Sequence, residues 1–185
     1  MQQVKGVLFV DYVRMIRGRK DIDWTRYLSA AELDWVKRPI DVAAWYPMSV
    51  FESLGTAILD VFATGSLELA RMWGHQSVEL LVDDNPLLWA PHNPVETLNR
   101  VRVLRSTYFD FEAVQFAMVL EDELLLVVNY QMGARAEEAA CHQTFGFFEA
   151  LLGRAGGTDI VCDFLERSWA GDARTAISYR WTPPG

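Results

Sequence analysis

The chain has 185 residues, of which 51% are hydrophobic and 23% charged, a composition that excludes intrinsic disorder and predicts one compact domain over residues 1–185. The formal net charge of −8 disfavours nucleic acid as a partner, because such a field repels phosphate. No apolar run approaches the roughly 20 residues that span a bilayer. We therefore expect no membrane span and a cytoplasmic location.

The first half of the sequence predicts helices, because apolar residues recur at spacings of three and four. The first helix carries an apolar stripe from Val4 to Met15, and Asp23 is placed to cap a short helix after it. Ser49, with Glu52 three residues later, predicts a capping box at the start of another helix. Further helices are predicted at 30–37, from residue 66 to the turn at 83–86, and from 93 to about 105.

The second half changes to two hairpins around one long helix. Residues 114–120 and 124–130 flank an acidic turn as one strand pair, and 159–166 with 174–181 form the other. Between them, residues 134–155 keep a helical stripe that includes Thr144 and Phe148. The sequence therefore predicts the α+β class, with an N-terminal helical half, then a β-hairpin, a long helix and a β-hairpin in a mostly antiparallel sheet.

Short segments in a shared order resemble H-NOX (haem nitric-oxide/oxygen-binding) domains. They are Val4–Val7, Trp45–Pro47 and Gly74 in the helical half, then Leu124–Tyr130, Gly133–Arg135 and Phe145–Leu152. The order is also similar to that of 4-vinyl-reductase domains and TRAPP subunits. Over nearly its whole length the chain most closely resembles a myxobacterial paralogous family of unknown function. The resemblance implies an H-NOX-like fold.

The residues that the resemblance assigns to a cofactor are largely replaced. Where H-NOX domains hold haem propionates with a Tyr-x-Ser-x-Arg motif, this chain has Tyr130, Met132 and Ala134, with Arg135 one residue late. The haem histidine would fall around 99–101, where no imidazole is present. Zinc-binding relatives use thiolates near the last hairpin, and residues 166–176 contain no cysteine or histidine. We predict no haem, no metal and no other cofactor.

The aromatic residues favour an apolar ligand pocket between the helices and the sheet. Tyr130 and Arg135 are the predicted polar anchors. The predicted walls are Trp45, Tyr46, Trp73 and His75. Two alternatives stay open, because the 45–47 segment also suits a hydrophobic staple on the next helix and His75 also suits a hydrogen-bonded core position.

The first turn of the long helix is a second place where a ligand anion is conceivable. Free amides, the helix dipole and Arg135 converge there. Glu137 and Glu138 occupy the same turn and already satisfy the dipole, so we do not expect a bound anion.

The cysteines do not predict catalysis. Cys141 and His142 are helical neighbours whose side chains point about 100° apart, which is poor geometry for a nucleophile and its base. With Cys162 they make a metal site only if the strand passes over the helix at the right height, a question that the sequence leaves open. No nucleotide-binding, metalloprotease or nucleophile-elbow motif is present, and we predict that the chain is not an enzyme.

Two functions remain. The first is a non-enzymatic sensory or ligand-binding domain that holds a small hydrophobic molecule without haem, in bacterial signalling. The alternative is a protein–protein interaction or assembly module with a filled core, acting as a dimer or heteromer. The resemblance implies a homodimer through N-terminal helices, for which Val4–Ile16 is the best apolar face.

Overall fold

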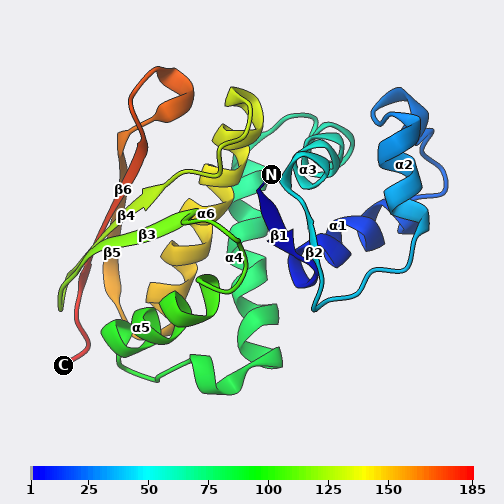
Figure 1. Ribbon diagram of the computed structural model, residues 1–185. Helices are drawn as coiled ribbons and strands as arrows, with labels where there is room; N and C mark the ends of the chain where they lie inside the picture. The colour runs from blue at the N-terminus through cyan, green and yellow to red at the C-terminus, as the bar shows by residue number, and fades with distance from the viewer. Residues whose placement is uncertain (1) are drawn as a thin grey trace. The chain divides into compact units, whose positions relative to one another are not determined.

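The computed structural model describes residues 2–185, and the chain is α+β as the sequence predicts (Figure 1). Its contacts group into two compact units. The N-terminal unit comprises the residues up to Ser66 together with Thr107–Phe111, and the C-terminal unit comprises Leu67–Ser106 and Glu112–Gly185. One domain over residues 1–185 therefore stays a prediction.

The N-terminal unit is helical and contains one short antiparallel strand pair, β1 (Gln3–Lys5) with β2 (Trp45–Pro47). Its other elements are α1 (Gly6–Gly18), the 3-10 turn η1 (Trp24–Arg26), α2 (Ala30–Lys37) and α3 (Met48–Ala63). Aromatic rings fill its core. Phe9 is fully buried and stacks on Tyr46 with ring centroids 4.6 Å apart.

The start of the first helix differs from the sequence-based expectation. The helix begins at Gly6 and not at Val4. Val4 instead lies opposite Tyr46 in the strand pair and bridges to Phe109 on its other side. Backbone pairing with segments distant in sequence therefore shortens the helix.

The capping box expected at Ser49 and Glu52 is wrong. Helix α3 begins at Met48, directly after β2, so Ser49 is already inside the helix and no side chain caps its N-terminus. The Met48 amide instead donates to the carbonyl of residue 2 at 2.9 Å. A complete capping box forms at Ser29 and Glu32, where an extended residue precedes α2.

The C-terminal unit packs helices against a four-stranded antiparallel sheet. The helices are α4 (Leu67–Asp84), η2 (Pro86–Leu88), α5 (Pro94–Arg105), α6 (Ala134–Arg154) and η3 (Ser168–Ala170). The strands are β3 (Val114–Val119), β4 (Glu123–Val128), β5 (Thr158–Glu166) and β6 (Thr175–Thr182), in the order β3-β4-β6-β5. Helix α6 lies against one face of the sheet and α4 runs beside α6 (Figure 1). This arrangement confirms the predicted hairpin, long helix and hairpin, with strand ends that differ by one or two residues.

Two glycines let α4 and α6 approach each other closely. A methyl group at Gly74 would lie 2.0 Å from the carbonyl oxygen of Gln143, and one at Gly146 would lie 2.1 Å from that of Arg71. Both obstacles are backbone atoms, so only glycine fits at either position without separating the helices.

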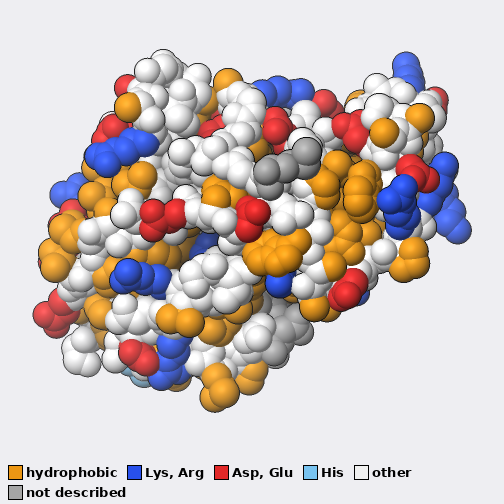
Figure 2. Space-filling model, in the orientation of Figure 1, with side chains coloured by type: hydrophobic (Ala, Val, Ile, Leu, Met, Phe, Trp, Pro, Cys, Tyr) orange, Lys and Arg blue, Asp and Glu red, His pale blue; other side chains and the backbone are white. Residues whose placement is uncertain are grey.

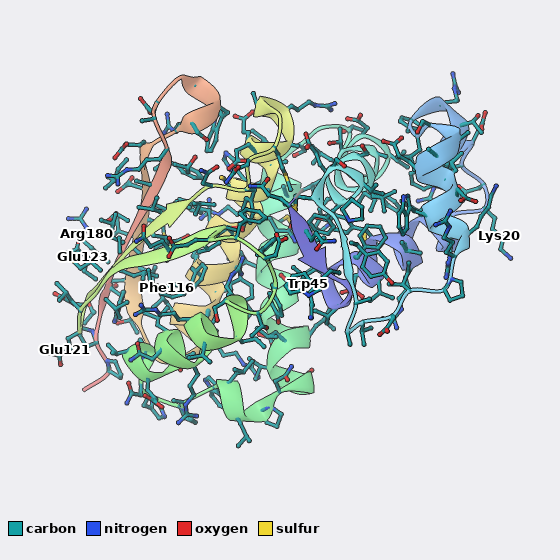
Figure 3. The ribbon with its side chains drawn as sticks, in the orientation of Figure 1. Lys20, Trp45, Phe116, Glu121, Glu123 and Arg180 are labelled. Carbon is teal, nitrogen blue, oxygen red and sulfur yellow. The ribbon has the colours of Figure 1, made fainter. Side chains whose placement is uncertain are left out.

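The sheet has an apolar inner face and a mixed outer face. Phe116 on β3 meets Phe148 of α6 edge to face, with ring centroids 5.5 Å apart. On the side away from α6, Glu123 lies opposite Arg180 in the β4–β6 ladder (Figure 3). This alternation matches the period of two in strands that bury one face.

Among the described residues, no single helix is long and apolar enough to cross a bilayer. Only α3 and α4 taken together meet that test, by length and composition alone.

Candidate functional site

A buried polar cluster in the C-terminal unit surrounds Tyr130, in the loop between β4 and α6. Its ring is buried, and its hydroxyl lies 2.6 Å from Thr144 Oγ1 on α6. Arg105 Nη2, from the last turn of α5, donates to the same hydroxyl at 3.1 Å. Burial raises the pKa of Tyr130 above its ordinary value, so the phenol is neutral at physiological pH.

The loop that carries Tyr130 is fixed by a buried carboxylate. Glu137, in the first turn of α6, accepts hydrogen bonds from the amides of Tyr130 at 2.8 Å and Met132 at 3.0 Å. These bonds satisfy two backbone donors where no strand or helix does so. Glu137 is therefore more than a dipole partner for its helix, since it sets the position of the Tyr130 ring.

Arg135, predicted beside Tyr130 as an anchor, is exposed on the first turn of α6. The guanidinium that reaches the Tyr130 hydroxyl is that of Arg105. Sequence reasoning missed Arg105, because a cation in the last turn of a helix is ordinarily explained by the helix dipole. Thr144 could have been found from the sequence, because it is a polar residue on the apolar stripe of the long helix. A hydroxyl at a buried position is expected to have a hydrogen-bond partner.

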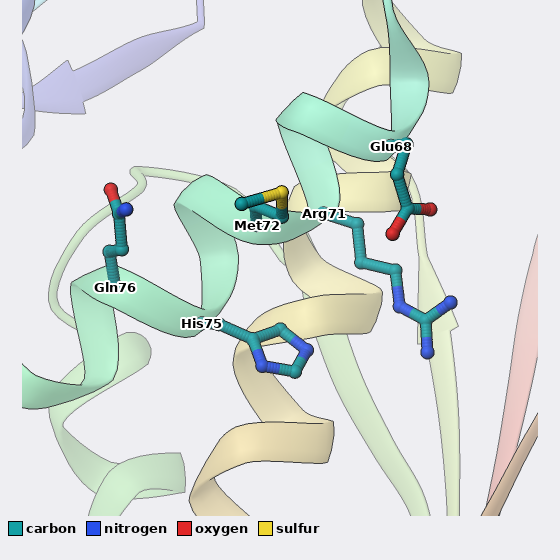
Figure 4. Close-up of a pocket in the computed structure, with 5 residues that line it drawn as sticks. All are labelled: Glu68, Arg71, Met72, His75 and Gln76. Atoms are coloured by element: carbon teal, nitrogen blue, oxygen red, sulfur yellow. The ribbon is translucent and has the colours of Figure 1, made fainter.

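His75 lies on α4 in an open hollow of about 330 Å³, lined by Glu68, Arg71, Met72, His75 and Gln76 (Figure 4). The imidazole Nε2 is 2.8 Å from Glu149 Oε2 on α6. Arg71 also donates to both oxygens of Glu149, at 2.6 Å and 2.8 Å through Nη2.

Glu149 is ionised in this setting. Its burial opposes ionisation, but the hydrogen bonds from Arg71 and His75 outweigh that effect and hold the pKa of the carboxyl below its ordinary value. Trp73 is half-buried on the same helix and does not line the hollow. Four of the five lining side chains are therefore charged or polar and the fifth is Met72, whereas the sequence predicts a pocket walled by aromatic rings.

Trp45 and Tyr46 belong to the N-terminal unit, where they have different surroundings. Tyr46 is buried against Phe9, and its hydroxyl accepts from the Asp41 amide at 2.9 Å. Trp45 is 39% exposed, and the Lys5 Nζ lies 4.0 Å from its ring centroid. Within its unit, Tyr46 packs the core and Trp45 lies at the surface.

The cysteines have the environment of packed thiols. Burial raises the pKa of Cys162 to about 12 and raises that of fully buried Cys141 as well, so both remain protonated. His142 faces the rings of Phe164 and Trp169, at 5.0 Å and 6.1 Å. Among the side chains that the structure describes, no group of three from His, Cys, Asp or Glu is arranged to hold a metal ion.

No protein-family model matches the sequence, and no curated protein matches it. Solved structures of H-NOX proteins do match over nearly the whole chain. An S. oneidensis H-NOX protein in the Fe(II)NO state is 9% identical, with 96% of this chain and 99% of that chain covered and a TM-score of 0.64. The unliganded Fe(II) protein from K. algicida is 14% identical, with 96% of each chain covered and a TM-score of 0.60. A mutant of the T. tengcongensis protein is 14% identical, with 97% and 98% covered and a TM-score of 0.60. At these identities the likeness establishes the H-NOX-like fold that the sequence predicts.

The residues present do not fit a haem at the position that the resemblance gives. A haem iron needs a His, Cys, Met or Tyr side chain as axial ligand. Helix α5 supplies none of these along Pro94–Arg105, and it buries Leu98 and Val101. The Tyr130 hydroxyl, which the resemblance assigns to a propionate, is already hydrogen-bonded to Thr144 and Arg105.

Proposed function

We propose that this chain is a non-enzymatic sensory domain that binds a small hydrophobic molecule without haem. The observation that carries the proposal is the H-NOX-like fold over at least 96% of the chain, combined with an α5 helix in which no side chain can serve as an axial ligand of haem iron. One of the solved structures with this fold, the S. oneidensis H-NOX protein, is in an Fe(II)NO ligation state. A chain that keeps this fold without a ligand for iron is suited to another small molecule, since one fold commonly serves several ligands.

The experiment is native mass spectrometry of the full chain purified from its own host. We expect a retained small mass that is lost on denaturation, together with no visible absorption from haem. Trp73 lies outside the hollow of Figure 4, but we propose that its half-buried ring is a wall of a separate apolar site. Trp73→Ala should then shorten retention of that mass, whereas Tyr27→Ala, at an aromatic residue that is 46% exposed, should not. A stoichiometric Soret band after hemin titration, abolished by replacing one histidine, would contradict the proposal.

An interaction module is the second candidate, and exposed apolar side chains favour it. Among the described residues, Leu87, Val103 and Leu80 are 85%, 70% and 68% exposed in the C-terminal unit. On the face drawn in Figure 2, hydrophobic side chains lie at the surface between charged ones. Mass spectrometry that finds only protein, as a stable dimer, would favour this function over ligand binding.

The proposed homodimer through N-terminal helices has less support. Helix α1 buries Phe9, Val13 and Ile16 inside its own unit. Val7, which is 40% exposed, is the large apolar side chain that α1 leaves outside. Light scattering at micromolar concentration tests the dimer, and a particle of 21.1 kDa would remove it.

A further inference from the structure

Arg105 is a half-buried cation with no carboxylate partner in the described part of the chain. Its Nη2 donates to the Tyr130 hydroxyl at 3.1 Å, and its Nε is buried without any hydrogen-bond partner. The guanidinium carbon lies 5.1 Å from the ring centroid of Phe147 and 5.4 Å from that of Phe148. All of these groups belong to the C-terminal unit.

Two other arginines of the same unit provide an internal comparison. Arg71 and Arg154 also lie over aromatic rings, at 5.0 Å from Phe145 and 5.2 Å from Trp89. Their side chains are 34% and 31% exposed, and each binds a carboxylate at 2.6 Å, Glu149 and Glu79 respectively. Stacking on a ring therefore accompanies an ion pair at those sites and does not replace it.

The surroundings of Arg105 offset only part of its charge. The last turn of α5 places it near the negative end of the helix dipole, and the two rings add a cation–π attraction. The carboxylate of Glu137 is already occupied by two backbone amides. Even partial removal of a guanidinium from water is unfavourable without a counter-ion, so an anion bound to Arg105 would stabilise this site.

We propose that Arg105 binds a carboxylate carried by the hydrophobic ligand, with Tyr130 as the positioning residue. The inference rests on the proposed function for the apolar part of that ligand, and it names the ligand class as an apolar carboxylic acid. A planar guanidinium edge matches the two oxygens of a carboxylate. Thr144 holds the Tyr130 hydroxyl, which in turn fixes Nη2 of Arg105.

The test compares two fluorescent probes on the full chain, a dansyl-labelled undecanoic acid and its methyl ester. The probes differ only in the negative charge. We expect the acid to bind about tenfold more tightly than the ester, or better, since a charge-assisted pair readily supplies that factor. Arg105→Gln should bring the two affinities close to equality while leaving that of the ester unchanged.

The control is Arg102→Gln, which removes the same charge from an exposed position on the same helix and should preserve the preference for the acid. Arg105→Lys keeps the positive charge but loses the paired N–H donors of the planar guanidinium, so it should give an intermediate preference for the acid over the ester. Circular dichroism melts establish that each variant folds, and if Arg105→Gln does not fold, Arg105→Lys provides the test.

Tyr130→Phe separates positioning from packing. Loss of the hydroxyl should lower the affinity for the acid a few fold and leave the ester unaffected, whereas a purely structural role would weaken both probes together. Equal affinities for acid and ester in the wild-type chain would overturn the anion site and leave the proposed function standing. Binding of neither probe would count against the apolar site and so against the proposed function itself.

Discussion

The two compact units fill their interiors with different chemistry. In the N-terminal unit the buried side chains are apolar or aromatic, and Phe9 stacks on Tyr46 and lies at a tilt to Phe51. Within the described chain, the buried polar side chains, Thr97, Glu137, Thr144, Thr175 and Ser178, all lie in the C-terminal unit. The stability of the N-terminal unit therefore depends on how well its side chains fill the core. The stability of the C-terminal unit depends in addition on the geometry of its buried hydrogen bonds.

The largest effect is expected from truncating the aromatic core of the N-terminal unit. Phe9 is fully buried and contacts Tyr46, Phe51 and Trp35. Phe9→Ala should lower the free energy of unfolding by about 3–5 kcal/mol, measured by urea denaturation, because it leaves a cavity among rigid rings. Val7→Ala on the same helix, at an exposed position, should cost less than about 1 kcal/mol. Similar losses for both variants would mean that the ring stack is not the core of this unit.

The next largest effect concerns the helix crossing in the C-terminal unit. Gly146→Ala places a methyl group 2.1 Å from the carbonyl oxygen of Arg71, so α4 and α6 must separate. We expect a loss of about 3 kcal/mol in unfolding free energy. Gly153→Ala on the same helix meets only the tip of Ile160 at 3.5 Å and should be neutral or slightly stabilising. A destabilised Gly153→Ala with an unaffected Gly146→Ala would contradict the crossing.

The difference between the units also explains how much the sequence could predict. The order of elements, the α+β class and the helix predicted from 93 to about 105, which the structure has as α5, follow from apolar period and local turn chemistry. The start of α1 could not be predicted in this way, because the pairing of Val4 with Tyr46 joins segments that are far apart in the chain. Local patterns carry no information about such partners.

The candidate site was predictable only in part, for the same reason. Tyr130 is identified by the resemblance and lies buried in the structure, and its role as a ligand anchor stays a prediction. Its partner Arg105 lies 25 residues earlier in the chain. Nothing in the local sequence distinguishes Arg105 from Arg102, although one is half-buried and the other exposed. Which arginine faces the core depends on the rotation of α5, whose apolar stripe is weak.

A third prediction isolates the hydrogen bonds of the C-terminal unit. Glu137→Gln keeps the shape of the side chain but replaces one of two acceptor oxygens with a donor facing a backbone amide. We expect a loss of about 2 kcal/mol in unfolding free energy, since a buried donor is left unsatisfied. Glu138→Gln, one position along and half-buried, should change stability by less than about 0.5 kcal/mol. Equal losses of stability in the two variants would show that Glu137 acts only through the helix dipole and not through its hydrogen bonds to the loop.

The smallest effect is the pH dependence that Glu149 gives the C-terminal unit. Because its folded-state pKa lies below the ordinary value of 4.5, the unfolded chain takes up a proton first as the pH falls. The stabilisation is therefore complete at neutral pH and decreases as the pH falls through the folded pKa. Glu149 is 21% exposed at its side chain, so we expect a contribution of about 1 kcal/mol. Glu149→Gln should be less stable than the wild type at neutral pH by that amount and should converge with it in acid, as followed by urea denaturation across pH. A difference that stays constant between neutral and acidic pH would show that Glu149 contributes through packing and not through its charge.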